Sequence, residues 1–89
     1  MLLAALAALA ITPYTATQYP QSERDFAAVV VAGAACQHLV NGVPLDIVTT
    51  RAAEIFVSQG IDSTIVHEAD VVQKAKEVYN YIKTRKCKP

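Results

Sequence analysis

The 89-residue sequence has little charge and no excess of either sign. Lys and Arg together number eight, Asp and Glu also number eight, and charged residues make up 18% of the chain. A balanced charge provides no overall field that would attract nucleic acid or an acidic membrane surface. We therefore expect no nucleic-acid partner of the kind that a strongly basic protein binds.

Glycine, proline and cysteine are also scarce, with three, four and two residues. So few glycines and prolines exclude collagen-like and low-complexity chains, and two cysteines are too few for a multiply cross-linked mini-protein. Apolar residues, by contrast, make up 53% of the chain, which excludes a disordered tail. A chain of this length buries only roughly 60–65% of its unfolded surface, so we expect one small domain over residues 1–89.

An unbroken apolar run opens the chain, from Met1 to Ile11. Its leucines and alanines favour a short helix. Eleven residues rise only about 16 Å, roughly half of what a bilayer span needs, so we expect no membrane span. A cleaved export signal is the alternative, because Ala8-Leu9-Ala10 has the small-x-small form of a cleavage site, although no Lys or Arg precedes the run.

A helix that is apolar on every face must be covered on every face. The rest of the chain is too small to surround it, so we expect the arm at residues 1–12 to pack on another copy or another protein. The predicted interface comprises the large side chains of the arm and a glycine where another helix can approach closely: Leu2, Leu3, Leu6, Leu9, Ile11 and Gly33. A first helix partly buried against its own chain is the alternative.

The composition of residues 13–22 predicts a linker, because its two prolines disfavour helix in the residue before each. Ser22 is the expected N-cap of the first helix. Asn41-Gly42 is its expected end, because glycine supplies a left-handed residue. The buried stripe of this helix is expected at Phe26, Val29, Val30, Gly33, Cys36, Leu39 and Val40, which have helical spacing.

Two further helices follow the same logic. The second is expected to begin near Pro44 or Asp46 and to end at Gly60, with Ile61 in a Schellman motif. Its predicted stripe is Leu45, Val48, Ala52, Ile55 and Phe56. The third is expected to be capped by one of the consecutive residues Asp62, Ser63 and Thr64, with a stripe at Ile65, Ala69, Val72, Ala75, Tyr79 and Ile82.

The connections between these helices are short, which makes consecutive helices antiparallel. The expected fold is therefore all-α. It consists of a short apolar N-terminal helix or arm at residues 1–12, a linker at residues 13–22 and an up-down-up three-helix bundle at residues 23–89.

The cysteines and histidines do not have the spacing of a metal site. Cys36 and His38 are two apart on a helix and point about 200° apart, and neither His67 nor Cys87 has a second ligand nearby in the sequence. The chain also lacks a Gly-rich phosphate loop, a paired-carboxylate motif and a nucleophile elbow. We therefore expect no metal, no cofactor and no catalytic residue.

A disulfide between Cys36 and Cys87 is compatible with the expected topology. In an up-down-up bundle the first and third helices are parallel, so both cysteines lie near the same end. A crosslink closing about 50 residues would contribute roughly 4 kcal/mol in the chain-entropy model. Two free thiols are the alternative that we favour here, because thiols stay reduced in the cytosol and the compartment is unknown.

These features predict a non-enzymatic interaction or assembly subunit that self-associates or docks on a larger complex through its N-terminal segment. Small accessory and structural proteins of phages and bacteria are analogous in style. The expected partner is a protein or a second copy, giving a homo-oligomer, and the favoured location is the cytoplasm or a macromolecular assembly.

Two alternatives remain open. The first is a small secreted helical protein with one disulfide. The second is a weakly binding DNA regulator, because the stretch from Ala53 to Ala69 resembles a helix-turn-helix. Against the second, Glu68 and Asp70 would bring negative charge to the phosphates.

Overall fold

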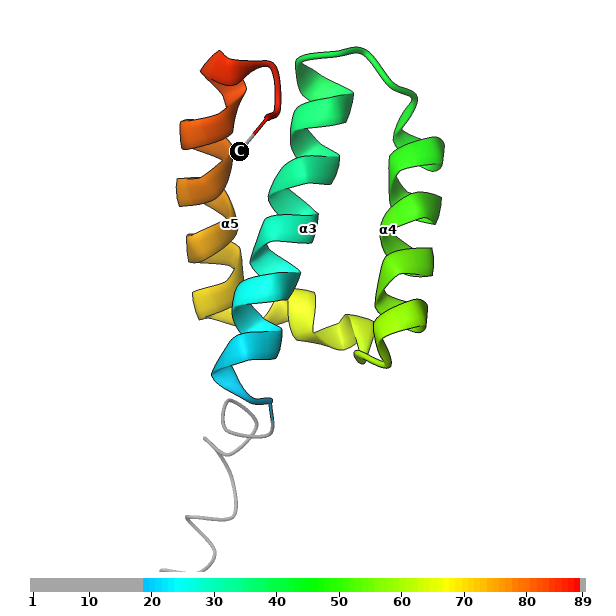
Figure 1. Ribbon diagram of the computed structural model, residues 1–89, viewed down its shortest axis with the longest axis vertical. Coiled ribbons are helices and arrows are strands. Elements are labelled where there is room, and N and C mark those ends of the chain that lie inside the picture. The colour runs from blue at the N-terminus through cyan, green and yellow to red at the C-terminus, as the bar shows by residue number, and fades with distance from the viewer. Residues whose placement is uncertain (1–18, 89) are drawn as a thin grey trace, which may run out of the picture.

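The computed structural model describes residues 19–88 (Figure 1). Within that range the chain is all-α and contains no strand, which confirms the predicted fold class for this part. The elements are α3 (Gln21–Leu39), α4 (Leu45–Gln59), the 3-10 helix η1 (Ser63–His67), α5 (Ala69–Ile82) and the 3-10 helix η2 (Lys83–Arg85). The predicted arm at residues 1–12 lies outside the described residues, as does most of the predicted linker.

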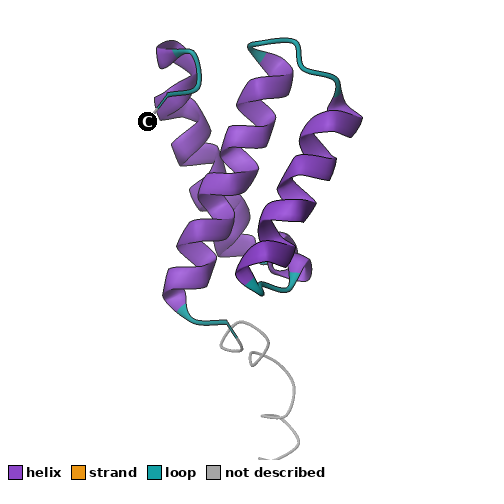
Figure 2. Ribbon diagram, turned by 45° about the vertical axis from the view of Figure 1, so that its right-hand side comes forward, coloured by secondary structure: helices purple, strands orange, loops and turns teal. Residues whose placement is uncertain are grey.

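Helix α3 is the centre of the arrangement. It runs upward in Figure 1, α4 returns downward on one side of it, and α5 runs upward on the other side. Figure 2, in which α4 comes forward, shows the same order with short connecting loops. Helix α3 packs on both neighbours and more extensively on α5, whereas η1 contacts all three α-helices. The three α-helices described therefore have the up-down-up topology.

The start of α3 differs from the prediction. Its N-cap is Pro20, in an extended conformation (φ −60°, ψ 150°), and Ser22 lies inside the helix. The Pro20 carbonyl accepts hydrogen bonds from the backbone N–H groups of Glu23 and Arg24, at 3.0 and 3.1 Å. The backbone of Pro20 thus begins the helix without a side-chain cap, and the predicted Ser22 cap is wrong.

The buried face of α3 also differs from the predicted stripe. Small residues occupy most of it: Arg24, Ala27, Ala28, Ala32 and Cys36 are buried. The larger residues Phe26, Val29, Leu39 and Val40 are exposed. Alanines let the backbones of α3 and α5 approach closely, so the bulky side chains lie outside that contact. Of the predicted stripe, only Cys36 is fully buried.

Helix α4 has the predicted ends. Gly60 is left-handed (φ 69°), and the N–H of Ile61 donates to the Phe56 carbonyl at 2.9 Å, as a Schellman motif requires. At the other end the Pro44 carbonyl accepts hydrogen bonds from the N–H groups of Ile47 and Val48 in the first turn, at 3.0 and 3.2 Å. Only Val48 and Phe56 are buried in this helix, so most of its predicted stripe is at least partly exposed.

The third predicted helix is divided in two. Asp62 caps η1 by accepting from the Thr64 N–H, and Glu68 adopts an extended conformation (φ −69°, ψ 135°) before α5 begins. Residues 63–82 therefore do not form one continuous α-helix. Of the predicted stripe, Ile65, Ala75 and Ile82 are buried as expected. Ala69 and Val72 are exposed, and Val71 is buried in their place.

The buried side chains form two clusters along α3. The larger one joins all three α-helices and η1: Ala27, Ala28, Phe56, Ile65, Val71 and Ala75. The smaller one, Ala32, Cys36 and Ile82, joins α3 to α5 alone. The half of α4 that is farther from η1 consequently contributes little to the core.

Candidate interaction surface

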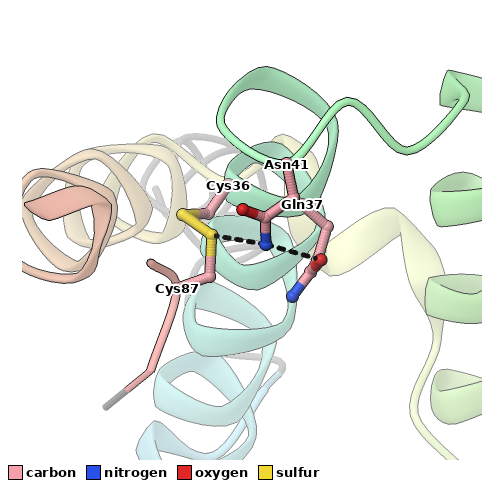
Figure 3. Close-up of a disulfide and its surroundings, with 4 residues drawn as sticks. All are labelled: Cys36, Gln37, Asn41 and Cys87. Atoms are coloured by element: carbon pink, nitrogen blue, oxygen red, sulfur yellow. Dashed lines mark hydrogen bonds between the residues drawn. A yellow bond between two sulfur atoms is a disulfide. The ribbon is translucent and has the colours of Figure 1, made fainter. Parts of the chain in front are cut away.

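Cys36 and Cys87 form a disulfide with Cα atoms 5.7 Å apart (Figure 3). Cys36 is fully buried near the end of α3, and Cys87 follows η2 with its N–H donating to the Ile82 carbonyl at 3.0 Å. Asn41 donates a 3.7 Å hydrogen bond from Nδ2 to the Cys87 sulfur. The alternative of two free thiols, favoured from the sequence, is therefore wrong for this structure.

A charged cluster links the opposite ends of the same two helices. The Arg24 side chain is only 9% exposed and lies 2.7 Å from Asp70 Oδ2 and 3.7 Å from Glu68 Oε1. Sequence reasoning missed Arg24, because its neighbours Glu23 and Asp25 make it look like an ordinary surface charge and give no sign of a partner 46 residues away. The only signal was the pair of acidic residues near the start of the third helix. Helices α3 and α5 are thus joined at both ends.

No comparable link holds α4 among the contacts described. Its apolar side chains are largely exposed, and Val57 reaches 81% exposure. The exposed large apolar residues of this helix are Leu45, Ile47, Ile55 and Val57. Because Val48 and Phe56 alone anchor it from inside, α4 leaves apolar surface open on both sides of its contact with α3.

One side of this contact is a groove of about 420 Å³, here named the α3–α4 groove. Its walls come from α3 and α4, and two residues of η1 close its lower end. None of its lining residues is Asp, Glu, Lys or Arg. They are Val31, Ala34, Ala35, His38, Leu39, Leu45, Val48, Thr49, Ala52, Ala53, Phe56, Ser63 and Val66. Such a volume lies within the range of protein binding pockets.

A second hollow between α3 and α5 adjoins this groove. It shares the α3 residues Val31, Ala35 and Leu39 with the α3–α4 groove, and Lys76 is the only charged residue of its lining. Both hollows therefore open on the same face of α3, separated by these three side chains. Leu39 is 65% exposed there. The result is a wide apolar surface with little charge.

Among the predicted interface residues, the structure places only Gly33. It lies on the other side of the α3–α4 contact, in a hollow that shares Ala34, Val48 and Ala52 with the groove. A Cβ atom at Gly33 would meet no heavy atom within 4 Å, so this glycine is not needed for packing within the described chain. The arm residues of the prediction, Leu2, Leu3, Leu6, Leu9 and Ile11, lie outside the described residues.

Asp62 and His38 make hydrogen bonds to residues close to them in the sequence. The Asp62 pKa lies below its ordinary value, because the carboxylate accepts hydrogen bonds from the backbone N–H and the hydroxyl of Thr64, with a smaller contribution from the Tyr19 hydroxyl. His38 Nδ1 lies 2.8 Å from the Val43 carbonyl oxygen, in the loop after α3. Within residues 19–88, no three His, Cys, Asp or Glu side chains are grouped to hold a metal ion.

The stretch that resembles a helix-turn-helix has an irregular second half. After the turn at Gly60, the chain forms the five-residue η1 and then the extended Glu68, and an α-helix begins only at Ala69. A recognition helix would be expected directly after the turn. In this segment, therefore, the helix that could enter a groove of DNA starts later than the sequence suggested.

None of the helices described is long and apolar enough to cross a membrane. No protein-family model matches the chain, and searches of curated proteins and of solved structures give no significant match either.

Proposed function

We propose that this protein is a small, non-enzymatic helical subunit that assembles with further copies of itself. The observation that carries the proposal is the apolar, nearly uncharged surface formed by the α3–α4 groove and the hollow beside it. Contiguous apolar surfaces of this kind mark sites of association. The interacting segment of the second copy is the apolar run of residues 1–11, which the rest of the chain is too small to surround.

The stronger linkage of α3 to α5 than of either helix to α4 supports this role. The disulfide and the Arg24–Asp70 pair join α3 to α5, whereas α4 leaves Leu45, which lines the groove, exposed. A rigid pair of helices combined with a more loosely packed third suits a binding element, because the third helix adjusts to its partner. Catalysis has no comparable support, since the titratable groups at the groove are limited to His38.

The disulfide also supports an oxidising location for the assembly. Cytosolic thiols are kept reduced, and structural disulfides form in secreted and other extracytoplasmic proteins. We therefore place the assembly outside the cytosol, in contrast to the cytoplasmic location expected from the sequence, with residues 1–11 retained in the mature subunit. An intact mass of the natural protein tests this retention. A full-length mass supports it, whereas a product that lacks residues 1–10 identifies a cleaved export signal and contradicts the proposed assembly through this segment.

Light scattering after size exclusion tests the assembly, under non-reducing conditions and over a concentration series. We expect the full chain to form a defined oligomer and Leu6→Asp to shift it to monomer, because a buried charge in the apolar run opposes docking. Thr15→Asp, which places the same charge in the predicted linker, is the control and should remain oligomeric. A chain that is monomeric at every concentration, or an oligomer unaffected by Leu6→Asp, contradicts the proposal.

A further inference from the structure

We infer that the α3–α4 groove is the receptor for residues 2–11 of a second copy, so that two chains exchange their N-terminal segments. The inference rests on the proposed self-association and adds where the segment binds. Exchange of an identical element between copies is a low-cost route to a dimer.

The groove matches the segment in chemistry. Its lining contains no Asp, Glu, Lys or Arg, and residues 1–11 contain none either. Four alanines, two on α3 and two on α4, form part of the groove wall: Ala34, Ala35, Ala52 and Ala53. Small side chains let a helix approach closely, and an Ala- and Leu-rich segment offers leucines of a size to fill the space between the walls.

The groove also matches the segment in length. Its α4 wall extends from Leu45 to Phe56, which is eleven steps of a helix and a rise of about 16 Å. The apolar run of eleven residues has about the same rise if it is helical. One segment would therefore cover the groove from its upper end to η1, including the exposed Leu39 side chain.

Tyr19, the first described residue after the N-terminal segment, lies near the lower end of the groove. Its hydroxyl lies 2.9 Å from Thr64 Oγ1 and 3.3 Å from Asp62 Oδ2, and the neighbouring η1 residues Ser63 and Val66 line that end. The seven residues between the run and Tyr19 span at most about 24 Å, so the run can bind at any groove within that distance of Tyr19.

The direction of the chain favours the groove of a second copy. Pro20 is extended and leads into α3 from the end of the helix, while the groove lies alongside that helix. A segment entering its own groove must therefore reverse direction within the linker, which contains Pro13. A segment that continues into a neighbouring molecule needs no reversal. Two copies related by a two-fold axis would satisfy both grooves at once.

Photocrosslinking of the full chain tests the location. The photoreactive residue p-benzoylphenylalanine replaces Thr49, an exposed residue that lines the groove, and in the control it replaces Val57, an exposed α4 residue outside this lining. Equal amounts of 15N-labelled and unlabelled protein are mixed, unfolded in urea with the disulfide intact and refolded together before illumination, so that the subunits of the two kinds combine at random. We expect peptides from residues 1–18 to be crosslinked to position 49 in mixed-isotope pairs, and position 57 to give none.

Each other outcome overturns a stated part of the inference. Crosslinks in which both peptides always carry the same label place the segment on its own chain. They overturn the claim that the segment binds to a second copy. An oligomer that Leu6→Asp dissociates but that shows no crosslink at position 49 overturns the groove as receptor and leaves the proposed function intact. A chain that is monomeric throughout overturns both.

A pair of point variants gives an independent measure. Leu39→Asn removes a large apolar side chain that the segment would bury, so we expect the dissociation constant of the oligomer to rise by about tenfold or more. Val57→Asn makes the same kind of change outside the groove and should leave the constant unchanged. Equal effects of the two variants, measured by sedimentation equilibrium, contradict the proposed location.

Discussion

Both Nε and Nη2 of Arg24 lie close to the same carboxylate oxygen of Asp70, at 2.8 and 2.7 Å. This pair joins the N-terminal ends of two parallel helices, whose C-terminal ends are joined by the Cys36–Cys87 disulfide. Helices α3 and α5 are therefore linked to each other at both ends, by an ion pair and by a disulfide. Helix α4 has neither kind of link in the described structure, and the apolar surface proposed for assembly lies beside it.

Replacing Arg24 with Met should lower the free energy of unfolding by about 1–3 kcal/mol. The change removes a buried, charge-assisted hydrogen bond to Asp70 while keeping much of the apolar stem. Urea denaturation measures it. Lys74→Met is the control, because Lys74 lies 4.0 Å from Asp25 and both side chains are half exposed, and such pairs contribute at most about 1 kcal/mol. Equal losses in the two variants would show that the buried Arg24 pair contributes no more to the free energy of unfolding than the exposed Lys74 pair does.

Reducing the disulfide should cost roughly 4 kcal/mol of stability. Cys36 and Cys87 are separated by 51 residues, and a crosslink closing a loop of that length removes about this much chain entropy from the unfolded state. Urea titrations with and without reductant give the difference. The double variant Cys36→Ala, Cys87→Ala should have the lower stability in both buffers and no response to reductant. An unchanged midpoint in protein whose thiols are fully alkylated after reduction would contradict the prediction.

Amide hydrogen exchange should be faster in α4 than in α3 or α5. Protection reflects the free energy of local opening, and segments with few buried apolar contacts open first. Only Val48 and Phe56 are buried in α4, whereas α3 and α5 are joined at both ends. Exchange followed by mass spectrometry at a concentration that gives monomer tests this. Uniform protection of the three helices would mean that α4 is held by contacts other than those described.

Asp62 should make the protein less stable in acid. Its pKa is lowered from the ordinary value of 3.8, so its contribution is fully present above that pH. The contribution is lost as the pH falls through the lowered pKa, because the protonated carboxyl is a weaker acceptor for the Thr64 N–H. Melting temperatures from pH 6 to pH 2 should fall more steeply for the unmodified chain than for Asp62→Asn. Parallel curves would show that the cap at η1 does not contribute.

Gly33→Ala should stabilise the monomer by about 0.5–1 kcal/mol. Glycine inside a helix costs about this much relative to alanine, and the new methyl group meets no atom within 4 Å. Gly60→Ala is the contrasting variant and should destabilise, because Gly60 has a φ of 69°. If Gly33→Ala instead weakens the oligomer, a neighbouring helix packs at Gly33 as the sequence predicted, and the interface extends to that side of α3.

Features determined by the local backbone were accessible from the sequence. The left-handed Gly60 ends α4 with the Ile61 hydrogen bond expected of it, and Pro44 precedes the first turn of that helix. Gly42 has a φ of 74° just after α3. These positions depend on the conformational preferences of a few adjacent residues. The short turns between helices then limited the topology to the up-down-up arrangement that the described residues have.

Features determined by contacts between distant residues required the tertiary structure. Apolar periodicity alone favoured Val29 and Leu39 as core positions, but close packing of α3 on α5 selected the alanines. The extended Glu68 divides the predicted third helix into η1 and α5, and Val71 is buried where Ala69 and Val72 were expected. Arg24 is buried because α5 presents Asp70 to it across the core, and a pattern along one helix carries no information on such a partner. The α3–α4 groove likewise exists only because α4 has few anchoring side chains, which is a property of the packed helices together.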